Sequence, residues 1–219
     1  MHLSAEIIDI LLLSLRVSIL ASLIGLGIGA PMGAYLCTIS NKSQTIWLTV
    51  FSALLAVPTV VVGLVVYLLL SRSGPLGWLN ILFTPTAIVI AQVLITVPVI
   101  TVFVHRACSA AWREVGDALR LDIVKRWRRM WEVGKIAKAG LVTAFLVAFG
   151  RAISEVGAVM IVGGNIRGVT RVMTTAITLE TRQGNYSIAV WLGVILVLLS
   201  LGVTIVTFLV TRERNPSKL

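Results

Sequence analysis

The stretch from Ser187 to Val210, SIAVWLGVILVLLSLGVTIVTFLV, contains no charged residue. A helix needs about 20 apolar residues to cross the hydrocarbon core of a bilayer, so this stretch predicts a membrane-spanning helix. Of the 219 residues, 58% are hydrophobic and only 13% are charged, and the mean hydropathy is +0.99. Soluble domains carry about 25% charged residues. The composition excludes a disordered chain, a disulfide scaffold and a typical soluble enzyme domain, and predicts an all-α integral membrane protein.

Four further apolar runs are long enough to cross a bilayer, which gives about five transmembrane helices. They are Ser14–Leu36, Ile46–Leu70, Thr86–Val104 and Gly140–Val162. As an alternative, the third run, which contains Pro98, forms a re-entrant or buried helix. The first run is a poor signal peptide because Glu6 and Asp9, rather than cations, precede it. Residues 1–13 either form a short helix on the outer surface or begin the first span.

The net charge of +10 is distributed unevenly among the segments between the runs. Cytoplasmic loops retain Lys and Arg, so this distribution indicates the orientation. With the N-terminus outside, thirteen cations lie on the cytoplasmic side and four outside. The thirteen are Lys42, Arg106, Arg113, Arg120, Lys125, Arg126, Arg128, Arg129, Lys135, Lys138, Arg212, Arg214 and Lys218; the four are Arg72, Arg167, Arg171 and Arg182. We therefore expect an external N-terminus, a cytoplasmic tail at 211–219 and no nucleic-acid partner.

The segment 105–139 lies between the third and fourth runs on the predicted cytoplasmic side. It contains no proline, and it mixes tryptophans with many cations. One interpretation is a helix that lies on anionic membrane lipid, with tryptophans at the level of the headgroups. The other is a docking element for a cytoplasmic partner. Composition alone leaves both open.

Two apolar runs contain residues suited to a translocation pathway. Pro58 removes a backbone donor from the second run and should kink it, and the Thr59 hydroxyl can satisfy a freed group. In the fourth run, Arg151 and Glu155 are four residues apart and should lie side by side on a helix. Gly150, Ser154 and Ala158 should form a stripe of small residues on the adjacent face. Charges in a span normally face a bundle interior or water, so we expect Arg151, Ser154 and Glu155 to line the pathway or a gate. Alternatively, the two charges pair and stabilise the fold.

The segment after the fourth run carries several hydrogen-bond donors on the predicted outer side. Arg167, Arg171 and the Thr174 hydroxyl suit a tetrahedral oxyanion, as do free backbone amides near Asn165. These four residues either contact an anion or dock an external partner. The only histidines are His2 and His105, and there is no metal-spaced cluster or nucleophile–base pair. We therefore expect no catalytic site, no metal site and no cofactor in this chain.

The pattern Ala118-Leu119-x-Leu121, followed by Glu132-Val133 and by Gly140, resembles the EAA loop of ABC-importer permeases. In that family the loop forms a coupling helix that sits in a cleft of the ATPase subunit. The resemblance implies ATPase coupling by Asp117, Ala118, Leu119, Leu121, Asp122 and Trp127. Asp122 stands where the family has a central glycine.

A second pattern extends from Gly150-Arg151-Ala152-Ile153-Ser154-Glu155-Val156-Gly157-Ala158 through Gly163-Gly164-Asn165-Ile166 to Thr174-Thr175-Ala176-Ile177. It is similar to permease subunits of tungstate ABC importers and, more loosely, to their molybdate and sulfate relatives. The resemblance implies a type I ABC-importer permease fold over residues 14–210. It also implies a second copy of the chain, an oxyanion-binding protein outside the membrane, and a cytoplasmic ATPase dimer that binds ATP and Mg²⁺.

The chain has no Gly-x-x-x-x-Gly-Lys-Ser/Thr phosphate loop, so the ATPase must be another polypeptide. We expect a transport subunit for an oxyanion, with tungstate as the ion that the resemblance favours. One alternative is a permease for molybdate or sulfate. Another, of a different class, is an ATP-independent channel or membrane assembly protein.

Overall fold

The computed structural model of the protein describes residues 2–39, 42–121, 131–132 and 134–212, and the side chains within 6–39, 42–113, 131–132 and 134–210. Over these ranges the chain is helical and contains no strand, which confirms the all-α prediction. The elements are α1 (His2–Thr38), α2 (Lys42–Leu54), α3 (Thr59–Leu70), the 3₁₀ turn η1 (Gly77–Leu79), α4 (Pro85–Leu121), α6 (Lys138–Ile153), α7 (Gly157–Gly163), α8 (Met173–Arg182) and α9 (Tyr186–Arg212).

Three helices are long and apolar enough to cross a membrane on their own: α1, α4 and α9. Two further spans are broken helix pairs. The axes of α2 and α3 differ by 93°, and those of α6 and α7 differ by 61°. With each pair counted as one span, the described chain has five, in agreement with the five apolar runs. Of the two alternatives for the third run, the re-entrant one is wrong because α4 continues through Pro98, whereas burial is confirmed: 67% of the membrane-length window of α4 is buried. The second and fourth runs are the broken ones.

Helix α1 shows no break near residue 13, which favours the alternative in which residues 1–13 begin the first span. Its 37 residues, at about 1.5 Å each, give a length of about 55 Å. The hydrocarbon core of a bilayer is only about 30 Å thick. The helix therefore crosses the membrane at a tilt or extends beyond the lipid.

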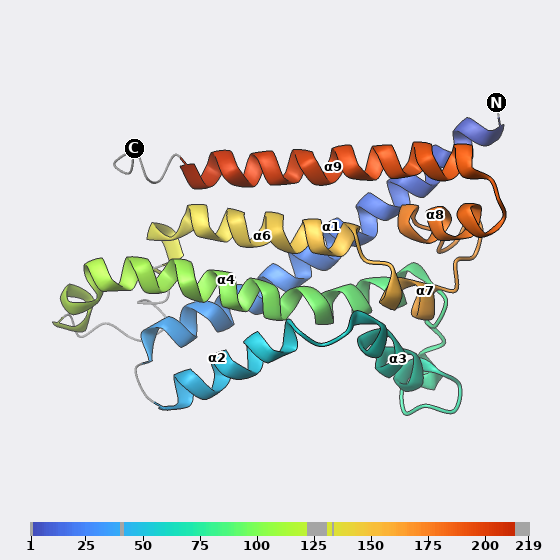
Figure 1. The fold of residues 1–219 in the computed structure, drawn as a ribbon. Coiled ribbons are helices and arrows are strands. Elements are labelled where there is room, and N and C mark those ends of the chain that lie inside the picture. Colours follow the sequence, from blue (N-terminus) through green and yellow to red (C-terminus); the bar gives the residue numbers. More distant parts are fainter. Residues whose placement is uncertain (1, 40–41, 122–130, 133, 213–219) are drawn as a thin grey trace.

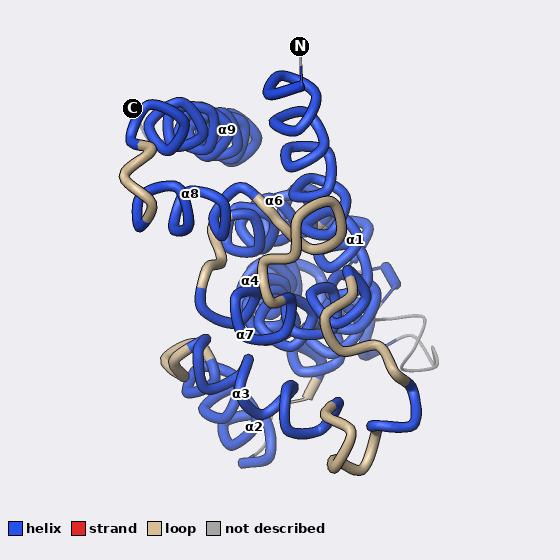
Figure 2. Tube along the Cα trace, turned by 90° about the vertical axis from the view of Figure 1, so that its right-hand side faces the viewer, coloured by secondary structure: helices blue, strands red, loops and turns tan. Residues whose placement is uncertain are grey.

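Helix α4 lies in the middle of the bundle and α9 at its edge (Figures 1 and 2). In Figure 1, α4, α6 and α9 run alongside one another, and α1 crosses them at an angle. We call the end of the bundle with the start of α1, η1, α7 and α8 the first end. The second end holds the close of α1, the start of α2 and the close of α9. This arrangement fits spans that alternate in direction.

The contact between α1 and α4 depends on glycines one helical turn apart: Gly25, Gly29 and Gly33. A Cβ atom added to Gly33 would lie 2.6 Å from the Thr101 carbonyl oxygen, and one added to Gly29 would lie 2.9 Å from that of Val97. Small residues of this spacing let helix backbones approach closely, which is a main source of helix association in membranes. The two helices therefore form a tight pair that the rest of the bundle surrounds.

We expect Gly33→Ala to lower the free energy of unfolding by about 1–3 kcal/mol, because the added methyl group has no space against α4. Gly27→Ala is the matched control on the same helix, since a Cβ there meets nothing within 4 Å. Thermal unfolding of the purified protein in detergent measures both. Equal midpoints for the two variants would contradict the close contact.

Candidate functional site

The second span breaks at Pro58, as the sequence predicted. Helix α2 ends at Leu54, and α3 begins directly after Pro58. Proline has no backbone N–H and cannot continue the hydrogen-bond ladder of α2. Its carbonyl oxygen instead accepts the Val61 amide at 2.9 Å, which closes the first turn of α3. The break thus gives the second half of this span a new direction.

Helix α3 packs against α7, the second half of the other broken span. A Cβ added to Gly63 would lie 2.6 Å from the Ala158 Cα atom, and one added to Gly157 would lie 2.6 Å from the Val60 side chain. The two short helices therefore meet at backbone distance. Each broken span places its second half against that of the other.

The fourth span is not one helix, which corrects two expectations from the sequence. Helix α6 ends at Ile153 and α7 begins at Gly157, so Ser154 and Glu155 lie in the break. Gly150, Ser154 and Ala158 consequently do not form one stripe. Arg151 is exposed whereas Glu155 is 7% exposed, and no ion pair between them occurs in the described part of the chain. The i,i+4 spacing does not bring the two side chains together because the helix ends at Ile153, between them.

The polar groups freed by this break find partners inside the protein. The Ala158 amide donates to a Glu155 carboxylate oxygen at 3.1 Å, so Glu155 caps the start of α7. The Thr174 hydroxyl, from α8, donates to the Glu155 carbonyl oxygen at 2.8 Å. The Gln92 side-chain amide, from α4, donates to the Ala152 carbonyl oxygen at 2.9 Å. Such partners allow non-helical backbone to lie at membrane depth.

A cavity of about 270 Å³ lies beside the two breaks. Its wall is mostly apolar and comes from α2, α3, α4 and α6. Among the described residues that line it, Arg151 is the one charged side chain. Thr59 adds a hydroxyl at the start of α3. An arginine whose charge faces a cavity rather than lipid can hold an anion by charge and by several N–H donors. The structure thus brings Thr59 and Arg151 to one cavity, with Pro58 next to Thr59 in the chain, while Glu155 is buried and caps α7.

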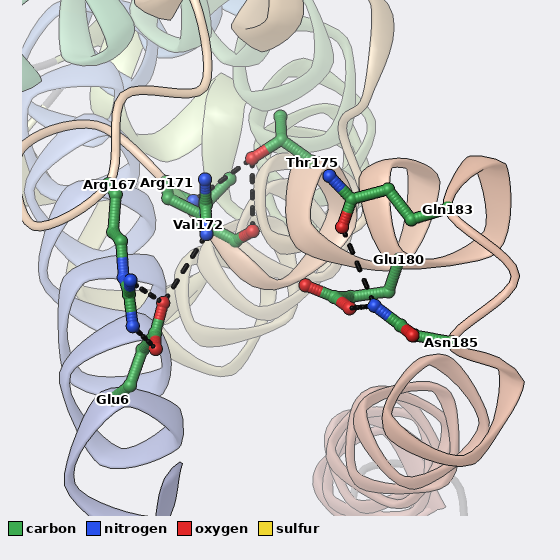
Figure 3. A network of polar contacts seen from close by, with 8 residues as sticks. All are labelled: Glu6, Arg167, Arg171, Val172, Thr175, Glu180, Gln183 and Asn185. Carbon is green, nitrogen blue, oxygen red and sulfur yellow. Dashed lines mark hydrogen bonds and ion pairs between the residues drawn. The ribbon is translucent and has the colours of Figure 1, made fainter. Parts of the chain in front are cut away.

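The loop between α7 and α8 is tied to the start of α1 by ion pairs (Figure 3). The Arg167 Nε atom donates to a Glu6 carboxylate oxygen at 2.8 Å, with a second bond from the same guanidinium group. Arg171 donates to Glu6 at 3.3 Å. The carboxylate raises the pKa of Arg167 above its ordinary value because it stabilises the charged form. Both predicted anion-contacting arginines therefore have an internal carboxylate as partner.

Other residues of the predicted outer group play separate parts. Asn165 has a positive φ of 53° directly after Gly164, and the Thr170 hydroxyl accepts the Ile166 amide at 2.9 Å, so this loop is tightly folded. Thr174 supports the Glu155 break instead of joining the arginines. Arg167 remains 71% exposed and is the residue of this group that a partner can reach.

The structure describes the backbone of some of the predicted coupling residues but not of all. The backbone of Asp117, Ala118, Leu119 and Leu121 forms the last turns of α4 at the second end of the bundle. Asp122 and Trp127 lie outside the described residues. The proposed contact of this segment with an ATPase stays a prediction.

Sequence reasoning missed two features that the structure makes central. Gln92 is the only amide side chain in the third apolar run, and that isolation was a usable signal. The spacing of Gly25, Gly29 and Gly33 is the small-residue pattern of close helix packing, and it too was readable.

Comparison with known proteins defines the class. Residues 21–215 match the family described as binding-protein-dependent transport system inner membrane component. The chain belongs to this family: it is a multi-pass membrane protein with the type I ABC-importer permease fold, and a transport component rather than an enzyme. Membership implies a partner ATPase and a substrate-binding protein.

Several curated permease proteins are similar to this chain over most of their length. The tungstate uptake system permease protein of Peptoclostridium acidaminophilum is 36% identical over 214 residues, which cover 95% of this chain and 91% of the relative. A probable anion ABC transporter permease protein of Haloferax volcanii is 40% identical, covering 90% and 87%. A molybdenum transport system permease protein of Azotobacter vinelandii is 26% identical, covering 91% and 92%.

We expect Glu155→Ala to lower the free energy of unfolding by about 1 kcal/mol, because the Ala158 amide loses its capping acceptor. Glu155→Gln keeps a side-chain oxygen at the same position and should stay close to the unmodified protein. Thermal unfolding in detergent compares the two variants. If both are destabilised equally, the negative charge rather than the cap is what matters.

Proposed function

We propose that this chain is the permease subunit of an ATP-driven tungstate importer. The observation that carries the proposal is the 36% identity to a tungstate uptake permease over nearly the whole of both chains. Molybdenum and sulfate permeases are also similar, at 26% and 28% identity, and are the second candidates. Membership of a binding-protein-dependent family speaks against an ATP-independent channel or assembly protein.

The proposed arrangement places the first end of the bundle outside the cell and the second end in the cytoplasm. The distribution of cations among the described residues supports it, because α2 begins at Lys42, α6 begins at Lys138 and α9 closes at Arg212 at the second end. Two copies of the chain form the channel, and each copy binds one ATPase subunit through residues 105–139. ATP and Mg²⁺ bind to the ATPases. Membrane lipid surrounds the exposed sides, including α9, whose span is not buried by the rest of the chain.

In the proposed mechanism, a binding protein delivers the oxyanion to the first end. Arg167 is one of the exposed cations there and a candidate contact for that protein. The ion then passes the cavity between the broken spans, where Arg151 and Thr59 offer donors. Closure of the ATPases moves the coupling segments and, through α4 and α6, changes the position of α3 and α7. The breaks at Pro58 and Glu155 are where such a change can take place.

The substrate is tested by elemental analysis of cells with and without this gene, grown with trace tungstate and molybdate together. Loss of cellular tungsten with unchanged molybdenum supports the proposal. Loss of molybdenum alone would still agree with an oxyanion permease, but it would contradict tungstate as the transported ion.

We expect Arg151→Leu to lower ATP-driven uptake by about tenfold or more, because the cavity loses its only cation. Insertion should be unchanged or improved, since a charge leaves a membrane helix. Arg151→Lys keeps the charge and should retain more uptake. Transport by the reconstituted complex, normalised to permease amount, is the measurement. A loss of protein with normal specific uptake would indicate a structural role instead.

We expect Leu119→Asp or Leu121→Asp to uncouple ATP hydrolysis from uptake while the permease stays folded. Both are apolar residues near the end of α4, in a segment rich in charged residues. Leu119→Met serves as a control of similar size and polarity. ATPase activity and uptake are measured on the same proteoliposomes. Unchanged uptake in both aspartate variants would remove this segment as the coupling element.

A further inference from the structure

Gln92 connects the central helix to the break in the fourth span. It lies in the membrane-length part of α4 and is only 2% exposed. Its Nε2 atom donates to the Ala152 carbonyl oxygen at 2.9 Å, across 60 residues of sequence. The Glu155 amide approaches the same oxygen at 3.2 Å. Gln92 is thus the side chain by which α4 holds the end of α6.

The orientation of the Gln92 amide follows from this partner. A backbone carbonyl only accepts hydrogen bonds, so the side-chain atom that faces Ala152 must be the nitrogen. The Gln92 oxygen is then buried, and no donor for it occurs among the described residues. Burial of an unpaired amide oxygen is unfavourable, and a methionine of similar shape would avoid it. An amide at this position therefore needs a reason other than packing.

The position of Ala152 supplies that reason. The preceding residue in α6 is Arg151, the one charged side chain in the cavity between α2, α3, α4 and α6. Neighbouring wall residues Leu94 and Ile95 come from the same part of α4 as Gln92. A bond that fixes the last turn of α6 against α4 also fixes where Arg151 projects.

We propose that Gln92 is a positioning residue for oxyanion transport: its bond to Ala152 holds the last turn of α6 so that Arg151 faces the cavity. This inference rests on the proposed role of Arg151 in the pathway. Gln92 does not contact the ion and acts through Arg151.

The test uses tungstate uptake by proteoliposomes that contain the permease, its ATPase and its binding protein. Gln92→Met keeps the shape and removes the donor, so uptake should fall by about tenfold at unchanged permease amount. Thr101→Val is the control, because its buried hydroxyl lies further along α4 and donates at 2.8 Å to the Val97 carbonyl oxygen of the same helix. Uptake by Gln92→Met within about twofold of the unmodified protein would overturn the proposal.

A second variant separates positioning from packing. In Gln92→Glu, a neutral carboxylic acid can donate its O–H to Ala152, whereas the carboxylate can only accept. Relative to the unmodified protein, uptake should be higher near about pH 6 than near about pH 8.5, because only the protonated side chain can donate to the Ala152 carbonyl oxygen. Arg151 and Glu155, the charged residues beside Ala152, are unchanged in this comparison. The same relative uptake at both pH values would contradict the proposal, even if Gln92→Met fails to accumulate.

Arg151→Leu, measured in parallel, separates the role of Gln92 from the role of Arg151. Reduced uptake with Arg151→Leu but normal uptake with Gln92→Met contradicts only the role of Gln92. Normal uptake with Arg151→Leu contradicts the pathway role of Arg151 and, with it, the route by which Gln92 acts.

Discussion

The structure depends on one constraint: backbone N–H and C=O groups inside a membrane need partners from the protein. Two of the five spans are broken, so the groups freed at their breaks must be satisfied internally. Proline at position 58 removes one donor outright, and the Ala152 and Glu155 carbonyls receive bonds from Gln92 and Thr174. The side chains that donate to the free carbonyl oxygens at the break in the fourth span come from α4 and α8. This dependence explains why polar residues such as Gln92, Glu155 and Thr174 are buried in an otherwise apolar bundle.

The bundle combines two kinds of helix contact. The unbroken helices α1 and α4 meet along a row of glycines, which makes them a compact scaffold. The half-helices α3 and α7 also meet at backbone distance, through Gly63 and Gly157, but each is joined to its first half by a break. Small residues allow two closely packed arrangements without large side chains in the way. The scaffold can thus stay fixed while the broken spans change position, which is what a transporter that exposes a site to alternate sides requires.

Much of this fold was predictable because its signals are local. Apolar runs marked the spans, and Pro58 marked a break through its missing N–H. The break at Ser154–Val156 was not predictable, since no proline or helix-ending sequence stands there and its partners lie 60 and 19 residues away. Arg167 and Arg171 looked like free donors because their partner Glu6 is 161 and 165 residues distant. The sequence showed which residues are polar but not which of them pair.

The central claim is that the cavity between the broken spans is the aqueous path of the ion. The direct measurement is the reaction of single introduced cysteines with a membrane-impermeant thiol reagent, in a chain whose Cys37 and Cys108 are replaced by alanine. Thr59→Cys lies in the cavity wall, and Val197→Cys lies on the exposed apolar side of α9. We predict that the cysteine at 59 reacts at a rate that changes when ATP binds the complex, while the cysteine at 197 stays unreactive. An unreactive cysteine at 59 with a reactive one at 197 would contradict a path through this cavity.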